Sequence, residues 1–417
     1  MKRPCTRYLT LAALCAAALA SSWLVSCESG CTGDLDGPVP PGRTVLAYMA
    51  SDNDLNAETS DKIAALCRGR AAARAGELLI YADTPQGARL LRALPDGTQQ
   101  TVAEYGAENS ASPAVLGRTL REVHASFPAP GYGLVFFSHG SGWLPQGALQ
   151  SPARTLPVAT GEHTASPGSR SMGRDESDEQ TPYAEMELEE FASAIADGSL
   201  DFIVFEACLM AGAEVAYALR DKADCMLASS AEILSPGFTP VYGSALKYLL
   251  DASAPAPECL AAFGSAYMGH VATQTGVYRS ATLSVVDLHE MEPLAARMAE
   301  LPTLSVRESD ITDDLQRFDR PGSYGDSPAV ARYFDLEDCA QRLAGETGAL
   351  REQLRRTVVW KDQTQRFMVG DDGNYGRYNG FDITAHSGLT VYLPRAELAA
   401  LNEAYRRTAW YRAVSGQ

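Results

Sequence analysis

Two short apolar runs, each ending on a reactive side chain, constrain the fold of this chain more than any other feature. One run, GLVFFSH, covers residues 133–139, and the other, DFIVFEAC, covers residues 201–208. Short runs rich in aromatic and β-branched residues predict buried strands of a parallel sheet. Open α/β sheets bind ligands at the carboxyl ends of their strands, so His139 and Cys208 are expected at one edge. An imidazole and a thiol placed there can form a dyad.

Strand and helix signals alternate along the rest of the chain, as they do in α/β domains. Up to residue 235 we expect further strands at residues 44–50, 77–83, 88–94 and 224–230, and helices at residues 113–123, 185–196 and 214–219. Beyond it we expect mainly helices, at residues 244–250, 258–268, 290–301, 336–343 and 350–358, with late strands at 280–287 and 389–393. The sequence thus predicts a mostly parallel sheet with helices on both faces over residues 43–235, completed by a more helical portion over residues 236–417.

The first 26 residues have the pattern of an export signal rather than of a folded element. Positive residues precede an apolar stretch at residues 9–20, and small residues lead up to Cys27. This pattern resembles a bacterial lipoprotein signal, which implies that Cys27 carries a lipid; an ordinary secretory signal is the alternative. The stretch is too short for a confident membrane span, so we expect an anchored protein of the cell envelope, periplasmic or surface-exposed. Residues 27–42, rich in Gly, Pro and Asp, are expected to be a tether.

The charge balance argues against two classes of partner. The chain has 35 Lys and Arg against 52 Asp and Glu, a formal net charge of −17. Proteins that bind nucleic acid or an anionic lipid surface present clustered basic residues to phosphates, and the sequence contains no such cluster. We therefore expect neither partner.

The cysteines show neither zinc-finger spacing nor an evident disulfide framework. Four of them occupy positions expected on the buried faces of helices and strands, where a free thiol behaves as a small apolar group: Cys67, Cys225, Cys259 and Cys339. Cys208 differs because it follows a strand and precedes a helical pattern. A helix N-terminus lowers the pKa of a thiol, so this position favours a nucleophile.

Three motifs in chain order resemble the clostripain family of cysteine peptidases. They are YMASDNDL at residues 48–55, SHGSGW at residues 138–143 and FEACLM at residues 205–210. Weaker matches at residues 228–232, 283–288 and 387–394 extend the resemblance over roughly residues 44–394. The resemblance implies a caspase-like fold and polypeptide substrates.

The resemblance also implies roles for individual residues. The thiolate of Cys208 would attack the scissile carbonyl, and His139 would handle the proton that the leaving amine requires. The backbone N–H groups of Gly140 and Cys208 would form the oxyanion hole, where each donor is worth about 10²–10³ in rate. No cofactor is required by this chemistry.

Members of this family cleave after Arg or Lys, and an acidic residue two positions before the cysteine is thought to form the base of the pocket. Glu206 stands there, where the usual residue is Asp, and its extra methylene would shorten the pocket. A buried carboxylate needs a cation, which suits a pocket for a basic side chain. The alternative is that a neighbour such as Arg279, or backbone donors, satisfies Glu206 internally. Glu232 is a second candidate carboxylate.

A long polar segment between the two motifs, residues 144–181, has no periodicity and is either functional or disordered. Relatives are often cut after a basic residue in this region. We therefore expect self-cleavage after Arg170, with Arg154 and Arg174 as alternatives. Such a cut would free the insert from the mouth of the site while the shared sheet holds the two pieces together.

Other interpretations stay open beside a self-activated, membrane-anchored, monomeric endopeptidase. The acidic turn formed by Asp52, Asn53, Asp54 and Asn56 could bind Ca²⁺, which some relatives need, but it lacks the other ligands of a calcium loop. A turn whose side chains cap the next helix is the favoured interpretation. An inactive, clostripain-like surface binding protein would keep the same fold, and a redox role for Cys208 is disfavoured because no Cys-x-x-Cys is present.

Overall fold

The computed structural model describes residues 41–145, 172–176, 184–301, 311–312, 314–320, 330–345, 347–376 and 378–416. The signal, Cys27, most of the tether, Arg154 and Arg170 lie outside these residues, so the expectations for them stay predictions. Among the described residues, no helix has the length and apolar character needed to cross a membrane.

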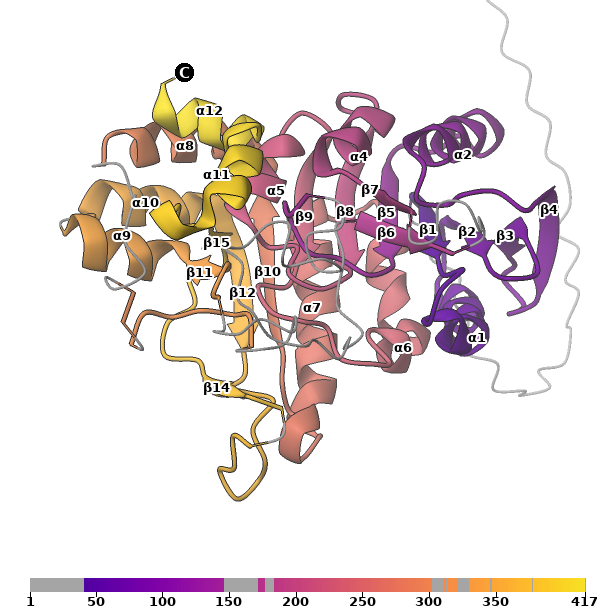
Figure 1. Cartoon of the computed structure of the whole chain (residues 1–417). Helices are drawn as coiled ribbons and strands as arrows, with labels where there is room; N and C mark the ends of the chain where they lie inside the picture. The colour runs from indigo at the N-terminus through magenta and orange to yellow at the C-terminus, as the bar shows by residue number, and fades with distance from the viewer. Residues whose placement is uncertain are drawn as a thin grey trace, which may run out of the picture. The chain divides into compact units, whose positions relative to one another are not determined.

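A nine-stranded sheet forms the centre of the fold (Figure 1), in the order β12-β10-β9-β8-β5-β1-β2-β3-β4. The five central strands are parallel: β1 (Thr44–Ala50), β2 (Glu77–Asp83), β5 (Tyr132–Phe137), β8 (Leu200–Glu206) and β9 (Ala223–Ala228). Antiparallel strands complete the two edges: β10 (Thr282–Asp287), β12 (Val358–Gln363), β3 (Ala88–Ala93) and β4 (Gln99–Gly106). The prediction of a mostly parallel sheet is confirmed.

Helices cover both faces of this sheet because its central strands are apolar on both sides. In β1, Val45 and Met49 face one core while Leu46 and Tyr48 face the other. One face packs on α1 (Asn56–Ala72), α6 (Thr239–Leu250) and α7 (Ala256–Ala272). The other face packs on α2 (Pro113–Ser126), α4 (Leu188–Ala194), α5 (Ala213–Ala218) and α8 (Met291–Ala299).

The later part of the chain adds helices, as predicted, and small two-stranded sheets, which were not predicted. Its elements are β11 (Phe334–Asp335), α9 (Leu336–Ala344), α10 (Gly348–Thr357), β13 (Arg366–Phe367), β14 (Phe381–Asp382), β15 (Thr390–Val391), α11 (Ala399–Arg406) and α12 (Ala409–Ser415), with 3₁₀ turns at Gly276–Tyr278, Leu288–Glu290 and Ala396–Leu398. β11 pairs with β15 and β13 with β14, so these short strands form two sheets separate from the nine-stranded sheet.

Several local expectations differ from the structure. Strands β4 and β12 were not predicted, because as sheet-edge strands they are largely exposed and lack an apolar pattern. The helix expected from residue 185 begins at Leu188, where Glu187 and Glu190 form a capping box. The residues before it form β7 (Ala184–Met186), which pairs with β6 (Met172–Asp175). Part of the insert expected to lack structure is therefore a strand.

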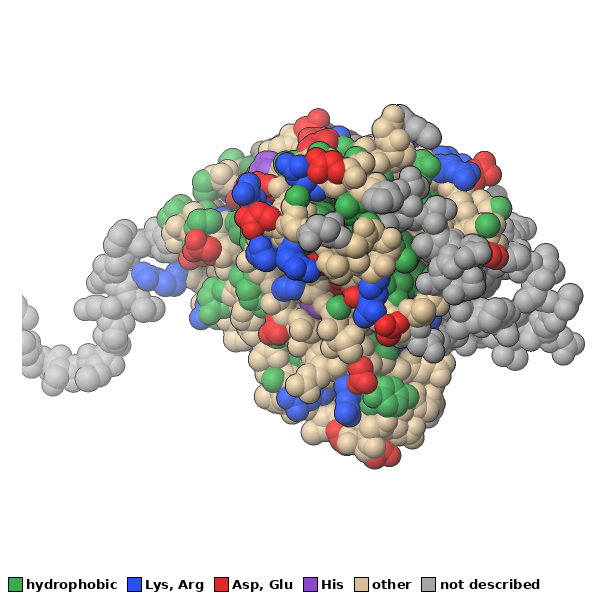
Figure 2. Space-filling model, turned by 90° about the vertical axis from the view of Figure 1, so that its left-hand side faces the viewer, with side chains coloured by type: hydrophobic (Ala, Val, Ile, Leu, Met, Phe, Trp, Pro, Cys, Tyr) green, Lys and Arg blue, Asp and Glu red, His purple; other side chains and the backbone are tan. Residues whose placement is uncertain are grey.

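The surface carries both signs of charge. Figure 2 shows basic and acidic side chains interspersed on one face, with no continuous basic area in that view.

Candidate active site

Three parallel strands bring the predicted motifs to one edge of the sheet. Tyr48 of β1 is paired with Phe136 of β5, which is paired with Phe205 of β8. Because these strands are parallel and in register, the segments that follow them emerge at the same edge. These segments contain Asp54, His139 and Cys208, respectively.

His139 has a carboxylate partner that the sequence interpretation did not assign. Its Nε2 atom lies 2.7 Å from Oδ1 of Asp54, and the imidazole side chain is only 16% exposed. The preceding residue is fixed as well, since the Ser138 hydroxyl donates to the Ala50 carbonyl at 2.8 Å. A carboxylate in this position orients the imidazole, the third role in a nucleophile–base–orienter arrangement. The sequence could have indicated Asp54, because it follows β1, the strand beside the one that leads to His139.

The polar turn after β1 has hydrogen bonds of its own. The Asn53 side chain accepts from the Leu55 N–H at 2.8 Å and donates to the Ala50 carbonyl at 3.1 Å. This turn leads directly into α1. The described residues contain no group of three or more His, Cys, Asp or Glu arranged to hold a metal ion.

Cys208 lies in a tight turn after β8 rather than at a helix N-terminus. Leu209 adopts a left-handed conformation with φ of 63°, and α5 begins only at Ala213. The thiol is half-buried, and its sulfur accepts from the Ile233 N–H at 3.4 Å. Burial, followed by the nearby carboxylate of Glu232, raises the pKa of the Cys208 thiol to about 12. The expectation that a helix N-terminus lowers this pKa is wrong, because the turn separates the thiol from the helix.

The loops that contain His139 and Cys208 touch through Gly140. A methyl group at this position would lie 2.8 Å from the Cys208 carbonyl oxygen and 3.0 Å from the Ala207 side chain, so a side chain there would force the loops apart. The backbone of Gly140 is therefore held against the Cys208 turn. Among the described residues, no hydrogen bond joins His139 to Cys208, and the bond from His139 runs to Asp54.

Glu206 lies in the core with a cation already bound. Its Oε1 atom is 2.5 Å from Nζ of Lys62, and both side chains are only 1% exposed. It also accepts from the Phe238 N–H at 2.6 Å and from the Tyr242 hydroxyl at 2.5 Å. Glu206 is therefore satisfied internally, which the sequence left open as an alternative. Its cation is Lys62 rather than Arg279, which lines a separate groove.

Sequence analysis missed Lys62, whose ammonium also donates to Thr239 Oγ1 at 2.7 Å and to the Pro236 carbonyl at 3.2 Å. The available signal was its spacing in α1, where it lies beside Ile63 and Leu66 on the buried face. A substrate cation reaching Glu206 would meet this second cation in a dry environment.

Glu232 also has an internal partner. Arg320 donates from Nε to Oε2 at 2.6 Å and from Nη2 to Oε1 at 3.0 Å, so both carboxylate oxygens are engaged. The side chains of Arg320 and Glu232 are 19% and 15% exposed. No sequence pattern indicated Arg320.

The described part of the insert docks beside the histidine. The Gly173 N–H donates to the His139 carbonyl at 3.2 Å, and the Glu176 N–H donates to the Asp52 carbonyl at 2.9 Å. The carboxylate of Asp175 accepts from the backbone N–H of Ser110 at 2.7 Å. Of the three candidate cleavage residues, Arg174 lies within β6.

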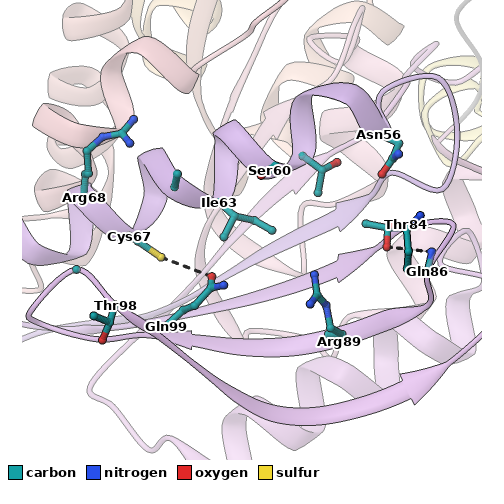
Figure 3. A pocket seen from close by; sticks show the side chains of 13 residues that line it. Asn56, Ser60, Ile63, Cys67, Arg68, Thr84, Gln86, Arg89, Thr98 and Gln99 are labelled. Carbon is teal, nitrogen blue, oxygen red and sulfur yellow. Dashed lines mark hydrogen bonds between the residues drawn. The ribbon is translucent and has the colours of Figure 1, made fainter.

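A separate groove of about 850 Å³ lies between α1 and the β3–β4 hairpin (Figure 3). Arg68 and Arg89 line it from opposite elements, and Cys67 donates weakly to Gln99 across it at 4.0 Å. Asn56 of the acidic turn lines this groove, but His139, Cys208, Glu206 and Glu232 do not. The four cysteines expected in the core are buried and free: Cys67, Cys225, Cys259 and Cys339.

A thiol and an imidazole on neighbouring strand ends of a caspase-like α/β sheet define a cysteine peptidase. The profile of the clostripain family matches residues 47–411. The chain belongs to the clostripain family. The prediction of the family and of the enzyme class is confirmed.

Solved structures agree with this assignment. A structure described as an inactive zymogen C11 protease from Parabacteroides distasonis is 28% identical, with a TM-score of 0.71, and the match covers 90% of this chain and 99% of that one. A secreted C11 cysteine protease from Bacteroides thetaiotaomicron, in complex with an irreversible peptide inhibitor, is 24% identical, with a TM-score of 0.70 and coverage of 90% and 99%. This second likeness shows the fold alone. No curated protein matches the chain.

Proposed function

We propose that this cysteine peptidase is an exported, lipid-anchored endopeptidase that cleaves after Arg or Lys, with Cys208 as nucleophile and His139 as acid and base. The observation that carries the proposal is the contact of the two loops. Gly140, next to His139, packs on the backbone of Cys208.

The chemistry follows from this arrangement. His139 takes the thiol proton, and the thiolate of Cys208 attacks the scissile carbonyl carbon. The N–H groups of Gly140 and Cys208 stabilise the oxyanion, and collapse breaks the C–N bond as His139 protonates the leaving amine. Water, deprotonated by His139, then hydrolyses the thioester and restores the thiol. Asp54 orients the imidazole in each step.

The proposed activation is a cut in the insert between the two motifs. Burial raises the pKa of the Cys208 thiol, so its attack depends on transfer of the proton to His139. Self-cleavage after Arg170, or after Arg154, would cut the insert ahead of β6. The hydrogen bonds of Gly173 and Glu176 to the active-site loops would then keep the new end near the site. Arg174 is the least favoured of the three because its peptide is part of the paired strand β6. The similar Parabacteroides distasonis protein is itself described as a zymogen.

Basic specificity is assigned to Glu232 rather than to Glu206. Lys62 neutralises Glu206 in the core, whereas Glu232 lies nearer the surface beside the cysteine turn. A carboxylate at this position can bind the guanidinium or ammonium group of the residue before the cleaved bond, termed P1.

Export and anchoring rest on the leader pattern ending at Cys27. The Bacteroides thetaiotaomicron protease of similar fold is described as secreted. Incorporation of labelled lipid, lost in Cys27→Ala, would test the anchor separately from activity.

The test compares fluorogenic peptides that differ only in P1, carrying Arg, Lys or Asp. We expect cleavage after Arg and Lys in the natural chain and its loss in Cys208→Ala and His139→Ala. Cys67→Ala, which removes another buried thiol, should retain activity. On a denaturing gel the natural chain should yield two pieces and Cys208→Ala one. A folded protein with no turnover, no splitting and no alkylation by an Arg-directed electrophile would instead indicate a binding protein.

A further inference from the structure

We propose that the groove between α1 and the β3–β4 hairpin binds an acidic, extended segment of the polypeptide substrate. This groove, called the α1 groove below, has a volume of about 850 Å³ and is lined from α1, from the turn after β2 and from the hairpin (Figure 3). The inference rests on the proposed function in one respect, since it takes the ligand to be part of a substrate.

The α1 groove is basic in a protein that is acidic overall. Arg68 and Arg89 line it, whereas neither Asp nor Glu is among the described residues of its lining. Both arginines are exposed, and their guanidinium groups form no ion pair within the described part of the chain. The formal net charge of the chain is −17. Two cations that line one groove without a carboxylate partner favour an anionic ligand.

Polar groups beside the two arginines suit a peptide backbone. Thr59 lines the groove and is only 3% exposed, and its hydroxyl has no hydrogen-bond partner among the described residues. Such a buried hydroxyl is rare, because it forfeits the hydrogen bond that it made to water. Ser60, Gln86 and Gln99 add a hydroxyl and two amides. An extended peptide carries donors and acceptors along its backbone, so this lining favours a peptide over a small inorganic anion.

The α1 groove is long enough for an extended segment. Asn56 and Thr84 line one end, and Arg68 and Gln99 line the other (Figure 3). Asn56 begins α1, and Arg68 lies about 18 Å further along the helix axis. An extended chain covers this length with about five residues. A single carboxylate or phosphate would occupy only part of it.

One end of the groove lies close to His139. Oδ1 of Asp54 lies 2.7 Å from Nε2 of His139, and Asn56 follows Asp54 by two residues. This end is therefore within roughly 13 Å of the imidazole, a distance that about four extended residues cover. In the sheet, β1 and β2 lie on the opposite side of β5 from β8, which leads to Cys208. Because His139 protonates the leaving amine in the proposed mechanism, the residues after the cleaved bond lie on the side of the groove.

The inferred substrate class is a polypeptide with acidic residues that begin about four positions after the cleaved bond. Two carboxylates of such a segment would pair with Arg68 and Arg89 at the same time. An exposed pair of this kind changes binding by up to about fivefold, and two pairs by about twentyfold.

The first experiment measures binding without catalysis. Two fluorescently labelled peptides, with five Glu or five Gln residues, are titrated with the full chain carrying Cys208→Ala, and anisotropy gives Kd. We expect the Glu peptide to bind about twentyfold more tightly, and added salt to reduce the difference because exposed charges are screened. Arg68→Gln and Arg89→Gln should each weaken this binding about fivefold, and the double variant about twentyfold. Arg121→Gln, which removes an exposed arginine from α2 on the other face of the sheet, is the control and should change nothing.

The second experiment measures kcat and KM for two fluorogenic substrates with Arg at P1. After the cleaved bond each has a neutral spacer of four residues, followed by five Glu or five Gln residues. In the natural chain we expect a lower KM for the Glu substrate. The Glu-to-Gln ratio of kcat/KM should fall about twentyfold in the double variant and stay unchanged in Arg121→Gln.

The outcomes separate this inference from the proposed function. Equal Kd values for the Glu and Gln peptides, or Glu binding that the double variant does not weaken, would overturn the inference even in an active peptidase. Binding in the groove by a chain that cleaves neither substrate would refute the proposed function and retain the groove as a site for acidic peptides. An equal loss of kcat/KM on both substrates would show that the arginines only support the structure.

Two competitors test the class of ligand. A labelled oligothymidylate that binds more tightly than the Glu peptide, or displacement of that peptide by inorganic phosphate, would overturn the acidic peptide as occupant. If the double variant fails to fold, the two single variants decide both experiments.

Discussion

Removing Lys62 should destabilise the protein strongly, because it leaves a buried carboxylate without its cation. In Lys62→Met the apolar length of the side chain is kept, so the packing of α1 is changed little. Breaking one side of a buried ion pair typically costs about 3–5 kcal/mol. Glu206 retains its hydrogen bonds from the Phe238 N–H and the Tyr242 hydroxyl. We therefore expect a loss near the lower end, about 3 kcal/mol in the free energy of unfolding.

Two further variants isolate the electrostatic part of this loss. Lys62→Met combined with Glu206→Gln removes both charges while the amide oxygen still accepts from Phe238, so it should recover about 1–2 kcal/mol. Arg92→Met breaks a pair with Glu77 whose side chains are 35% and 32% exposed. A pair at this exposure is expected to contribute less than about 1 kcal/mol.

The assay is urea denaturation at pH 7, followed by far-ultraviolet circular dichroism, with Cys208→Ala in every protein to prevent self-cleavage. The difference in unfolding free energy follows from the shift in midpoint at constant slope. The reasoning would be refuted if Lys62→Met lost no more stability than Arg92→Met, or if the double variant were less stable than Lys62→Met.

Two other changes test the electrostatics around the active-site edge. Burial, together with the Asp175 carboxyl, raises the pKa of Asp83 from 3.8 to about 8, so its contribution to stability is complete below about pH 4 and is lost as the pH rises through about 8. Asp83→Asn stays neutral, so its stability relative to the natural chain should increase between about pH 4 and 8 and level off above it, by at most about 1.4 kcal/mol per pH unit. Parallel melting-temperature profiles across this range would contradict this. Asp54→Asn should lower kcat by up to about 10²-fold with little change in KM, because the imidazole loses its orienting carboxylate. Asp61→Asn, on the exposed side of α1, is the control, and equal kcat values in the two variants would exclude a positioning role for Asp54.

The positions of the central strands could be predicted because their signal is local. The expected bounds of β1 and β2, residues 44–50 and 77–83, are those of the structure. Both strands are buried on two faces and therefore read as continuous apolar runs. Strand β4 is exposed over its first four residues and alternates exposed and half-buried residues only over the last four, so it gave no such run. Strand β6 is four residues long within a polar segment, and its pairing with β7 is a tertiary event.

The placement of His139 and Cys208 at one edge could also be predicted, because parallel strands send their carboxyl ends the same way. The raised pKa of the Cys208 thiol could not be predicted. Its pKa depends on burial under the segment around Ile233 and on the carboxylate of Glu232, which come from a later part of the chain. The helix pattern after Cys208 suggested a lowered pKa, but the intervening turn removes that influence.

By itself, the sequence determined the family and the positions of the central strands, because each is encoded in a few adjacent residues. Only the tertiary structure decided which cations pair with the carboxylates of Glu206 and Glu232. Glu206 meets Lys62 and Glu232 meets Arg320 across separations of 144 and 88 residues. A buried carboxylate must find a cation somewhere, but composition and spacing do not say which one. That choice follows from how α1 and the C-terminal portion pack against the sheet.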